Sequence, residues 1–150
     1  MRASTLLTAA TTAAVASARL VGISTPATLV ASQPYTITLL TENYIQSVAD
    51  VAVAWGYSTP ANAYPRSLGS STSSSYLGPD KSNQVENVTV QATAPADLAS
   101  LGDKAVLSVS LWSLYGASGG PAVNTWNVTV NVGDKVEGEV TSQEGLSGTA

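Results

Sequence analysis

Two acidic side chains, Glu42 and Asp50, lie in the stretch LLTENYIQSVADVAVAWGY, which begins and ends like a buried β-strand. A pair of carboxyl groups is what a glycoside hydrolase uses as its acid and its nucleophile or base. If the two residues lie on adjacent strands, their carboxyl groups can approach each other. Nothing in the surrounding sequence shows the burial or the neighbouring charge that raises the pKa of a general acid. We therefore expect that the protein is not an enzyme and keep this pair as the catalytic alternative.

Most other reaction chemistries lack their residues in this chain. It contains neither histidine nor cysteine, which excludes the common zinc sites and the Ser-His-Asp and Cys-His nucleophile systems. The glycine-rich run GASGG (116–120) lacks the lysine and the following helix of a phosphate-binding loop. No acidic run has the D-x-D-x-D-G spacing of a calcium loop. The sequence therefore predicts no cofactor and no bound metal.

Basic side chains are few and scattered along the chain. The sequence carries 6 basic and 10 acidic residues, a formal charge of −4. Phosphate-rich partners require clustered Lys and Arg. After the N-terminal segment, the basic residues stand singly: Arg19, Arg66, Lys81, Lys104 and Lys135. We therefore expect no nucleic acid and no anionic membrane surface among the partners.

The first eighteen residues, MRASTLLTAATTAAVASA, have the features of a secretory signal peptide. A basic start at Arg2 precedes a weakly apolar segment, and the end has the small-x-small pattern that signal peptidase recognises. We predict a signal peptide over 1–18, with cleavage between Ala18 and Arg19. No later segment approaches the roughly twenty apolar residues of a membrane span. The product is expected to be secreted.

Alternation of apolar and polar residues with period two dominates the rest of the chain. It is clearest in TWNVTVNV (125–132) and recurs in NVTVQA (87–92), AVLSVSLWSLY (105–115), YTITLL (35–40) and VAVAW (51–55). Pro- and Gly-containing turn signals separate these runs. Seven to eight such strands predict an all-β fold, an antiparallel β-sandwich of the immunoglobulin or fibronectin III type. We expect this single domain over 19–135 and a flexible acidic tail over 136–150.

In this fold, the polar centre of LLTENYIQSVADVAVAWGY (39–57) is the connection between two strands. YTITLLTEN and ADVAVAWGY flank the connection YIQSV (44–48). Because Tyr44 and Ile45 are adjacent, at least one of them should face outward. A tyrosine rimmed by polar groups is typical of a protein-binding patch. The alternative is that Tyr44 folds back over the end of the sandwich and closes the core. The predicted recognition surface comprises Glu42, Tyr44, Ile45, Gln46, Tyr57 and Tyr64.

Trp112 and Tyr115 define an alternative binding surface. Trp112 follows Leu111 in an alternating run, so its ring should point outward, whereas Trp55 and Trp126 are expected in the core. An exposed Trp112 next to Tyr115 would form a flat platform on which sugar rings can stack. The alternative function is therefore a secreted carbohydrate-binding or cell-wall-associated β-sandwich protein.

Two tripeptides match the acceptor pattern for N-glycosylation, with the asparagines at Asn87 and Asn127. In both, alternation places the asparagine on the outward face of a strand and the following valine toward the core. We predict a glycan on each. The alternative is an unmodified asparagine on a polar strand face.

Several segments together resemble the necrosis-inducing secreted protein family of fungi, which are small effectors of plant-associated species. The resemblance covers about residues 19–134 and rests on TENYIQSVADVAVAWGY, YLGPDKSN, NVTV, SLYGAS and WNVTVNVGD. It implies a secreted effector that binds host plant receptor-like and receptor-associated cytoplasmic kinases and suppresses pattern-triggered immunity, with cell death at high level. Such a protein acts by occupying a surface, and we expect it to be a monomer. The absence of cysteine is compatible with translocation into the reducing host cytoplasm.

Overall fold

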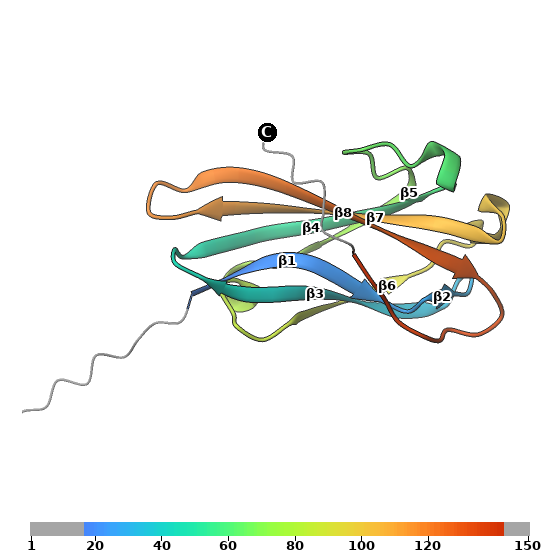
Figure 1. Cartoon of the computed structure of the whole chain (residues 1–150), viewed down its shortest axis with the longest axis horizontal. Helices are drawn as coiled ribbons and strands as arrows, with labels where there is room; N and C mark the ends of the chain where they lie inside the picture. Colours follow the sequence, from blue (N-terminus) through green and yellow to red (C-terminus); the bar gives the residue numbers. More distant parts are fainter. Residues whose placement is uncertain (1–16, 143–150) are drawn as a thin grey trace, which may run out of the picture.

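Nine strands in two facing sheets form the fold, which a computed structural model describes for residues 17–142 (Figure 1). The strands are β1 (Ser17–Thr25), β2 (Thr28–Leu29), β3 (Pro34–Tyr44), β4 (Val48–Ser58), β5 (Ser70–Tyr76), β6 (Val88–Thr93), β7 (Lys104–Tyr115), β8 (Gly120–Val132) and β9 (Val140–Thr141). Short 3-10 turns lie between them: η1 (Pro60–Asn62), η2 (Pro79–Lys81) and η3 (Leu98–Leu101). Within this part of the chain, no helix has the length and apolar character needed to cross a membrane.

The two sheets have the strand orders β6-β3-β1-β9, called sheet A, and β2-β8-β7-β4-β5, called sheet B. The sheets lie face to face, sheet A below and sheet B above in Figure 1. All pairings are antiparallel except that of β2 with β8. The arrangement confirms the predicted all-β sandwich, with consecutive strands β3 and β4 in different sheets as in immunoglobulin-like domains. The strand number exceeds the predicted seven to eight because β2 and β9, with two residues each, are too short to show alternation.

The core lies between the sheets and follows the alternation of the sequence. On β8, Trp126, Val128 and Val130 are buried against sheet A. On β7, the alternate residues Leu107, Val109 and Leu111 are fully buried at the centre. Each such side chain contributes about 1.5–3 kcal/mol by leaving water. These two strands supply much of the apolar layer that sheet B presents to sheet A.

The segment after β8 is held against the sandwich as far as Ser142. There, β9 pairs with the end of β1, and the Ser142 N–H donates to the carbonyl of Ile23 at 2.8 Å. Val136 and Val140 pack against the core. Up to Ser142 this segment does not extend freely as the prediction of a flexible tail implies, because its two valines are partly buried and its backbone pairs with an otherwise open strand edge. Residues 143–150 lie outside the described part.

A pair of buried tyrosine hydroxyls joins the two sheets across the core. The hydroxyl oxygens of Tyr35 on β3 and Tyr57 on β4 lie 2.5 Å apart. Burial raises the pKa of Tyr57 to about 12 and that of Tyr35 still further, so both phenols stay neutral. Tyr57 is only 1% exposed, and its place in the predicted recognition surface is wrong. Alternation along β4 puts Tyr57 on the same inward face as Trp55.

Replacing Tyr57 by Phe tests this pair, because the change keeps the ring and removes only the hydroxyl. It leaves the Tyr35 hydroxyl buried without a partner, which costs roughly 1–3 kcal/mol of unfolding free energy. In a domain of this size, we expect the melting temperature to fall by several degrees. Thermal and denaturant unfolding measure the loss. The control is the double variant Tyr35→Phe/Tyr57→Phe, which removes both polar atoms and should be more stable than either single variant; a double variant less stable than both would contradict the pairing.

Candidate functional site

Four side chains from three strands close one end of the sandwich, and we call them the end cluster: Arg19, Glu42, Tyr44 and Tyr115. The Arg19 Nη2 and Glu42 Oε1 atoms form an ion pair at 2.5 Å. The Arg19 guanidinium carbon lies 4.8 Å from the centre of the Tyr44 ring, close enough for a cation–π interaction. The Tyr44 and Tyr115 rings meet edge to face, 5.8 Å apart at 90°. Because β3 and β7 belong to different sheets, the stacked groups bridge the sandwich where the chain crosses from β3 to β4.

The residues at the crossing from β3 to β4 differ in burial and in their contacts with the end cluster. Tyr44 is half-buried between Arg19 and Tyr115, which favours the alternative in which it closes the core. The next residue, Ile45, is 92% exposed. The Ser47 carbonyl accepts a hydrogen bond from the Gly116 N–H at 2.9 Å, which ties the bend to the turn after β7. The exposed apolar group of the bend (45–47) is therefore Ile45.

Tyr64 does not join this bend. It is exposed in the segment after η1, so Tyr64 follows the end of β4 whereas the bend precedes its start. Eleven strand residues separate the two, a span of roughly 35 Å at the rise of an extended strand. The predicted recognition surface is thus divided: Glu42, Ile45 and Gln46 stay together at one end, and Tyr64 lies toward the other.

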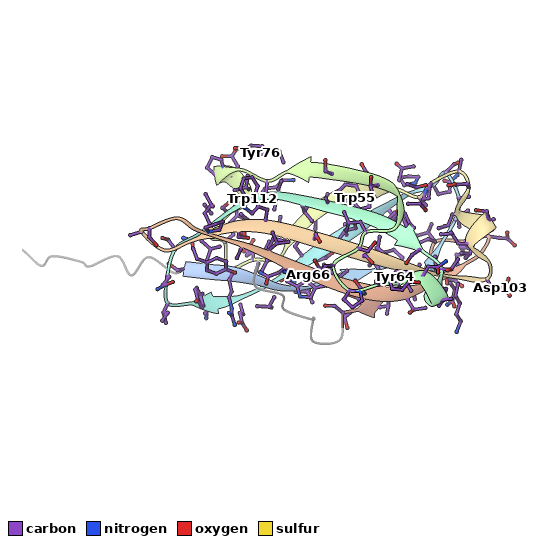
Figure 2. The ribbon with its side chains drawn as sticks, turned by 90° about the horizontal axis from the view of Figure 1, so that it is seen from above. Trp55, Tyr64, Arg66, Tyr76, Asp103 and Trp112 are labelled. Carbon is purple, nitrogen blue, oxygen red and sulfur yellow. The ribbon has the colours of Figure 1, made fainter. Side chains whose placement is uncertain are left out.

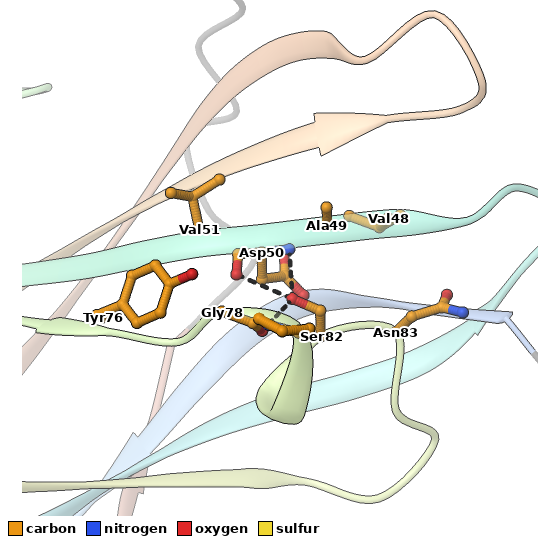
Figure 3. Close-up of a pocket in the computed structure, with 9 residues that line it drawn as sticks. Val48, Ala49, Asp50, Val51, Tyr76, Gly78, Ser82 and Asn83 are labelled. Carbon is orange, nitrogen blue, oxygen red and sulfur yellow. Dashed lines mark hydrogen bonds between the residues drawn. The ribbon is translucent and has the colours of Figure 1, made fainter.

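Asp50 is buried near the end cluster, at 2% exposure, where a bulge shifts the register of β4 against β7. Its Oδ1 accepts a hydrogen bond from the Ser113 hydroxyl at 2.6 Å. Its N–H donates to Ser82 Oγ at 2.8 Å, and the Ser82 hydroxyl lies 2.9 Å from the Asp50 carbonyl (Figure 3). Burial raises the pKa of Asp50, and the Ser113 hydrogen bond offsets part of the rise. Burial raises the pKa of Tyr115, and the negative charge of the Asp50 carboxylate raises it further.

Glu42 and Asp50 do not form the carboxylate pair that a hydrolase would need. The strands that carry them, β3 and β4, are consecutive in sequence but lie in different sheets, so the expected adjacency is wrong. The Glu42 carboxylate is half exposed and paired with Arg19, whereas the Asp50 carboxylate is buried and bonded to Ser113. Among residues 17–142, no group of three or more acidic residues comes together in a way that could hold a metal ion. Glu42 and Asp50, the residues of the catalytic alternative, therefore lie in separate environments with different partners.

Trp112 points outward as predicted, but it does not share a platform with Tyr115. Trp112 is 48% exposed on the outer face of sheet B, while Tyr115, three residues on, packs against Tyr44 of sheet A. An odd spacing along a strand places two side chains on opposite faces. The aromatic residue beside Trp112 is Tyr76, which is 71% exposed (Figure 2). Local alternation does not indicate this neighbour, because Tyr76 follows a run of serines.

The two glycosylation acceptors differ in their surroundings. Asn87 is exposed before β6, and its Oδ1 accepts a hydrogen bond from the Thr41 N–H at 3.0 Å. Asn127 is half-buried on β8, opposite the buried Ser108, and its own Oδ1 is buried without a hydrogen-bond partner. Gly56 follows Ser108 in the same row, and the segment between η1 and β5 lies over this position, where the Leu68 carbonyl leaves no room for a Cβ atom.

The predicted cleavage site falls within β1. Ser17 and Ala18 pair with Tyr44 and Asn43 on β3, and Ala18 is fully buried. Cleavage before Arg19 would remove these first two paired positions and keep the Arg19–Glu42 ion pair. The cleavage stays a prediction, and residues 1–16 of the signal peptide lie outside the described part.

Comparison with known proteins finds clear relatives. A sequence model of the Nis1 family matches residues 16–131. Necrosis-inducing secreted protein 1 of Colletotrichum higginsianum is 47% identical over 121 residues, which cover 81% of this chain and 83% of the relative. The protein of the same name from Colletotrichum orbiculare is 45% identical over 130 residues, 87% of this chain and 79% of the relative. A solved cycloisomaltooligosaccharide glucanotransferase of Paenibacillus sp. is 17% identical with a TM-score of 0.41, over 80% of this chain and 15% of that one; a similarity this weak carries no argument.

The raised pKa of Asp50 predicts a pH-dependent stability. The folded state holds its proton more tightly than the unfolded chain, whose pKa is near 3.8. The free energy of unfolding therefore falls as the pH rises from about 3.8 through the folded-state pKa. Asp50→Asn removes the buried charge, so we expect its melting temperature at pH 7 to exceed that of the wild type by a few degrees. The difference should shrink as the pH approaches 3.8.

A matched control for this prediction is Glu86→Gln, which changes the net charge equally at an exposed position. Scanning calorimetry between pH 3.5 and 8 compares the three proteins, and the control should follow the wild type. An Asp50→Asn protein that melts several degrees below the wild type at pH 7 would show that the carboxylate's hydrogen bonds outweigh its desolvation.

The unequal burial of the two acceptors predicts glycosylation at Asn87 and none at Asn127. Asn87 is exposed, whereas Asn127 is half-buried with its Oδ1 enclosed, so a glycan on Asn127 would have to displace the groups that bury it. In protein secreted from a eukaryotic host, peptide-N-glycosidase should produce one mobility shift. We expect Asn87→Gln and Thr89→Ala each to abolish that shift and Asn127→Gln to keep it. Two separate shifts, one lost with each asparagine, would contradict this prediction.

Proposed function

This chain belongs to the Nis1 family of necrosis-inducing secreted proteins of fungi, and we propose that it binds plant immune receptor-associated kinases and suppresses pattern-triggered immunity. The family membership carries the proposal, since both relatives are named for secretion and for necrosis. In this function, the protein acts by occupying a kinase surface, and cell death follows at high levels. It acts without catalysis and as a monomer.

The composition of the chain supports action inside a host cell. The sequence contains no cysteine, so reducing conditions break no bond of the fold. The described core consists mainly of apolar side chains, and its buried polar contacts include the Tyr35–Tyr57 hydroxyl pair and the Asp50–Ser113 hydrogen bond. A protein built in this way stays folded both in a secreted fluid and in the cytoplasm, where the kinase domains of receptors lie.

The bend at 45–47 supplies the contact surface in this proposal. Ile45 stands almost fully in water at its tip, flanked by the exposed Asn43 and Gln46. A protruding apolar side chain with a polar rim is suited to insert into a pocket of a partner, where hot-spot residues contribute most of the affinity. The end cluster below holds the bend in place from both sheets, so little conformational freedom is lost on binding.

Direct assay with a kinase domain tests the proposal. The mature protein, purified alone, is mixed with the cytoplasmic domain of a plant immune co-receptor kinase under reducing conditions. We expect it to co-precipitate with that domain and to lower the phosphorylation of a substrate. Ile45→Asp should weaken binding by about tenfold or more, the effect of losing a buried apolar anchor. Unchanged phosphorylation at saturating protein would contradict the function itself.

Tyr64→Asp is the matched control for Ile45→Asp. It introduces the same charge at another exposed apolar residue, but at the opposite end of β4. We expect it to bind the kinase as the wild type does, and both variants to keep the wild-type melting temperature. Equal loss of binding in both variants would show that the bend is not the contact surface.

A further inference from the structure

An apolar row crosses the outer face of sheet B near the end of the sheet where β5 stops. Its members are neighbours across four strands: Val123 on β8, Trp112 on β7, Ala52 on β4 and Tyr76 on β5. Val123, Trp112 and Tyr76 are exposed, and Figure 2 shows the two aromatic residues at the same end of this face. We call these four residues the outer row.

The spacing within the outer row leaves a shallow slot between the two rings. Ala52 pairs with both Trp112 and Tyr76, and adjacent strands are about 4.8 Å apart. The backbones that carry the rings are therefore roughly 10 Å apart, with only a methyl group between them. Large aromatic walls around a small floor suit a flat ligand lying across the strands.

Tyr76 also borders a cavity of about 490 Å³ that continues the slot along β4 (Figure 3). Four consecutive residues of β4 (48–51) line this cavity together with Gly78, Pro79, Ser82 and Asn83. The one carboxylate among them, that of Asp50, is buried and bonded to Ser113. The Tyr76 ring packs against Gly78, where there is no room for a Cβ atom. The ring is thus held at the cavity edge before any ligand arrives, and a volume of this size is typical of small-ligand sites.

The chemistry around the outer row selects a neutral, hydroxyl-rich ligand. The next row across the same strands consists of Thr125, Ser110, Ala54 and Ser74. Thr125 is buried and its hydroxyl lies 2.6 Å from that of the half-buried Ser110, whereas the Ser74 hydroxyl is exposed beside the aromatic rings. Among these eight paired positions there is no charged side chain, whereas protein-binding patches are enriched in arginine. A charged ligand would find no counter-charge on either row.

We propose that the outer row and its adjoining cavity bind a neutral β-linked polysaccharide. The equatorial hydroxyls of such a sugar leave its ring faces apolar, and these faces stack on Trp112 and Tyr76. Hydroxyls at the ring edges bond to the exposed Ser74 of the next row. The site goes beyond the proposed kinase binding, because it uses sheet B and not the bend around Ile45.

Intrinsic fluorescence of the full secreted protein provides the first test. Trp55 and Trp126 are buried whereas Trp112 is exposed, so acrylamide quenching and ligand-induced emission shifts report mainly on Trp112. The probes are hexamers of β-1,4-glucose, β-1,3-glucose and β-1,4-N-acetylglucosamine. We expect at least one of them to shift the emission and to protect Trp112 from acrylamide. No change with any of the three at millimolar concentration overturns the proposal.

Calorimetric titration of variants with the hexamer that binds provides the second test. Trp112→Ala and Tyr76→Ala should each lower the affinity by about tenfold or more, whereas Trp112→Tyr, which keeps a stacking ring, should retain most of it. Tyr64→Ala, an exposed aromatic outside the outer row, should bind as the wild type does. Equal affinity in the wild type and Trp112→Ala overturns the site. Loss of kinase binding in Trp112→Ala without sugar binding by the wild type also overturns it, since the face would then be a protein interface.

Discussion

Packing between sheets A and B carries the whole fold, because no cysteine is present to join them covalently. The inward faces of β7 and β8 meet those of β1, β3 and β6, and burial of their apolar side chains supplies the driving force. The Tyr35–Tyr57 hydroxyl pair adds a directional contact in the middle of this interface. A partner for each hydroxyl is required there, so the pair also helps to fix how one sheet sits on the other.

One irregularity of β4 links the interior to the outer face. The bulge between Asp50 and Ala52 lets Asp50 turn inward to Ser113, while Ala52 returns to the outward register beside Trp112. Bulges commonly redirect side chains near binding sites. Ser82 then fills the strand edge that β5 leaves open at this point, through its contacts with the Asp50 backbone. The buried carboxylate and the outer cavity are thus two results of the same change in register.

Alternation of apolar and polar residues predicts which face of a strand a side chain occupies, but it does not predict which strands pair. Alternation correctly placed Trp126 in the core and Trp112 outside, and it located the crossing between β3 and β4. It did not show that Tyr76 lies near Trp112, because that proximity depends on which strands pair and on the register after a bulge. The prediction that Tyr57 belongs to the recognition surface is wrong, because alternation from Trp55 along the strand places its side chain inward. The pairing of β9 was also missed, since two residues contain no period and their position depends on a distant strand.

The pairing of β1 with β9 is among the last contacts of the domain that can form. It joins the earliest and the latest strands of the described chain, and its side-chain bonds, Ser24 to Glu139 and Ile23 to Ser142, span 115 and 119 residues. Contacts so distant in sequence require closure of the largest loop and form late in folding. During export, one edge of β1 therefore stays open until the C-terminal segment emerges. The last pairing of sheet A is therefore available only once the residues up to Ser142 have been synthesised.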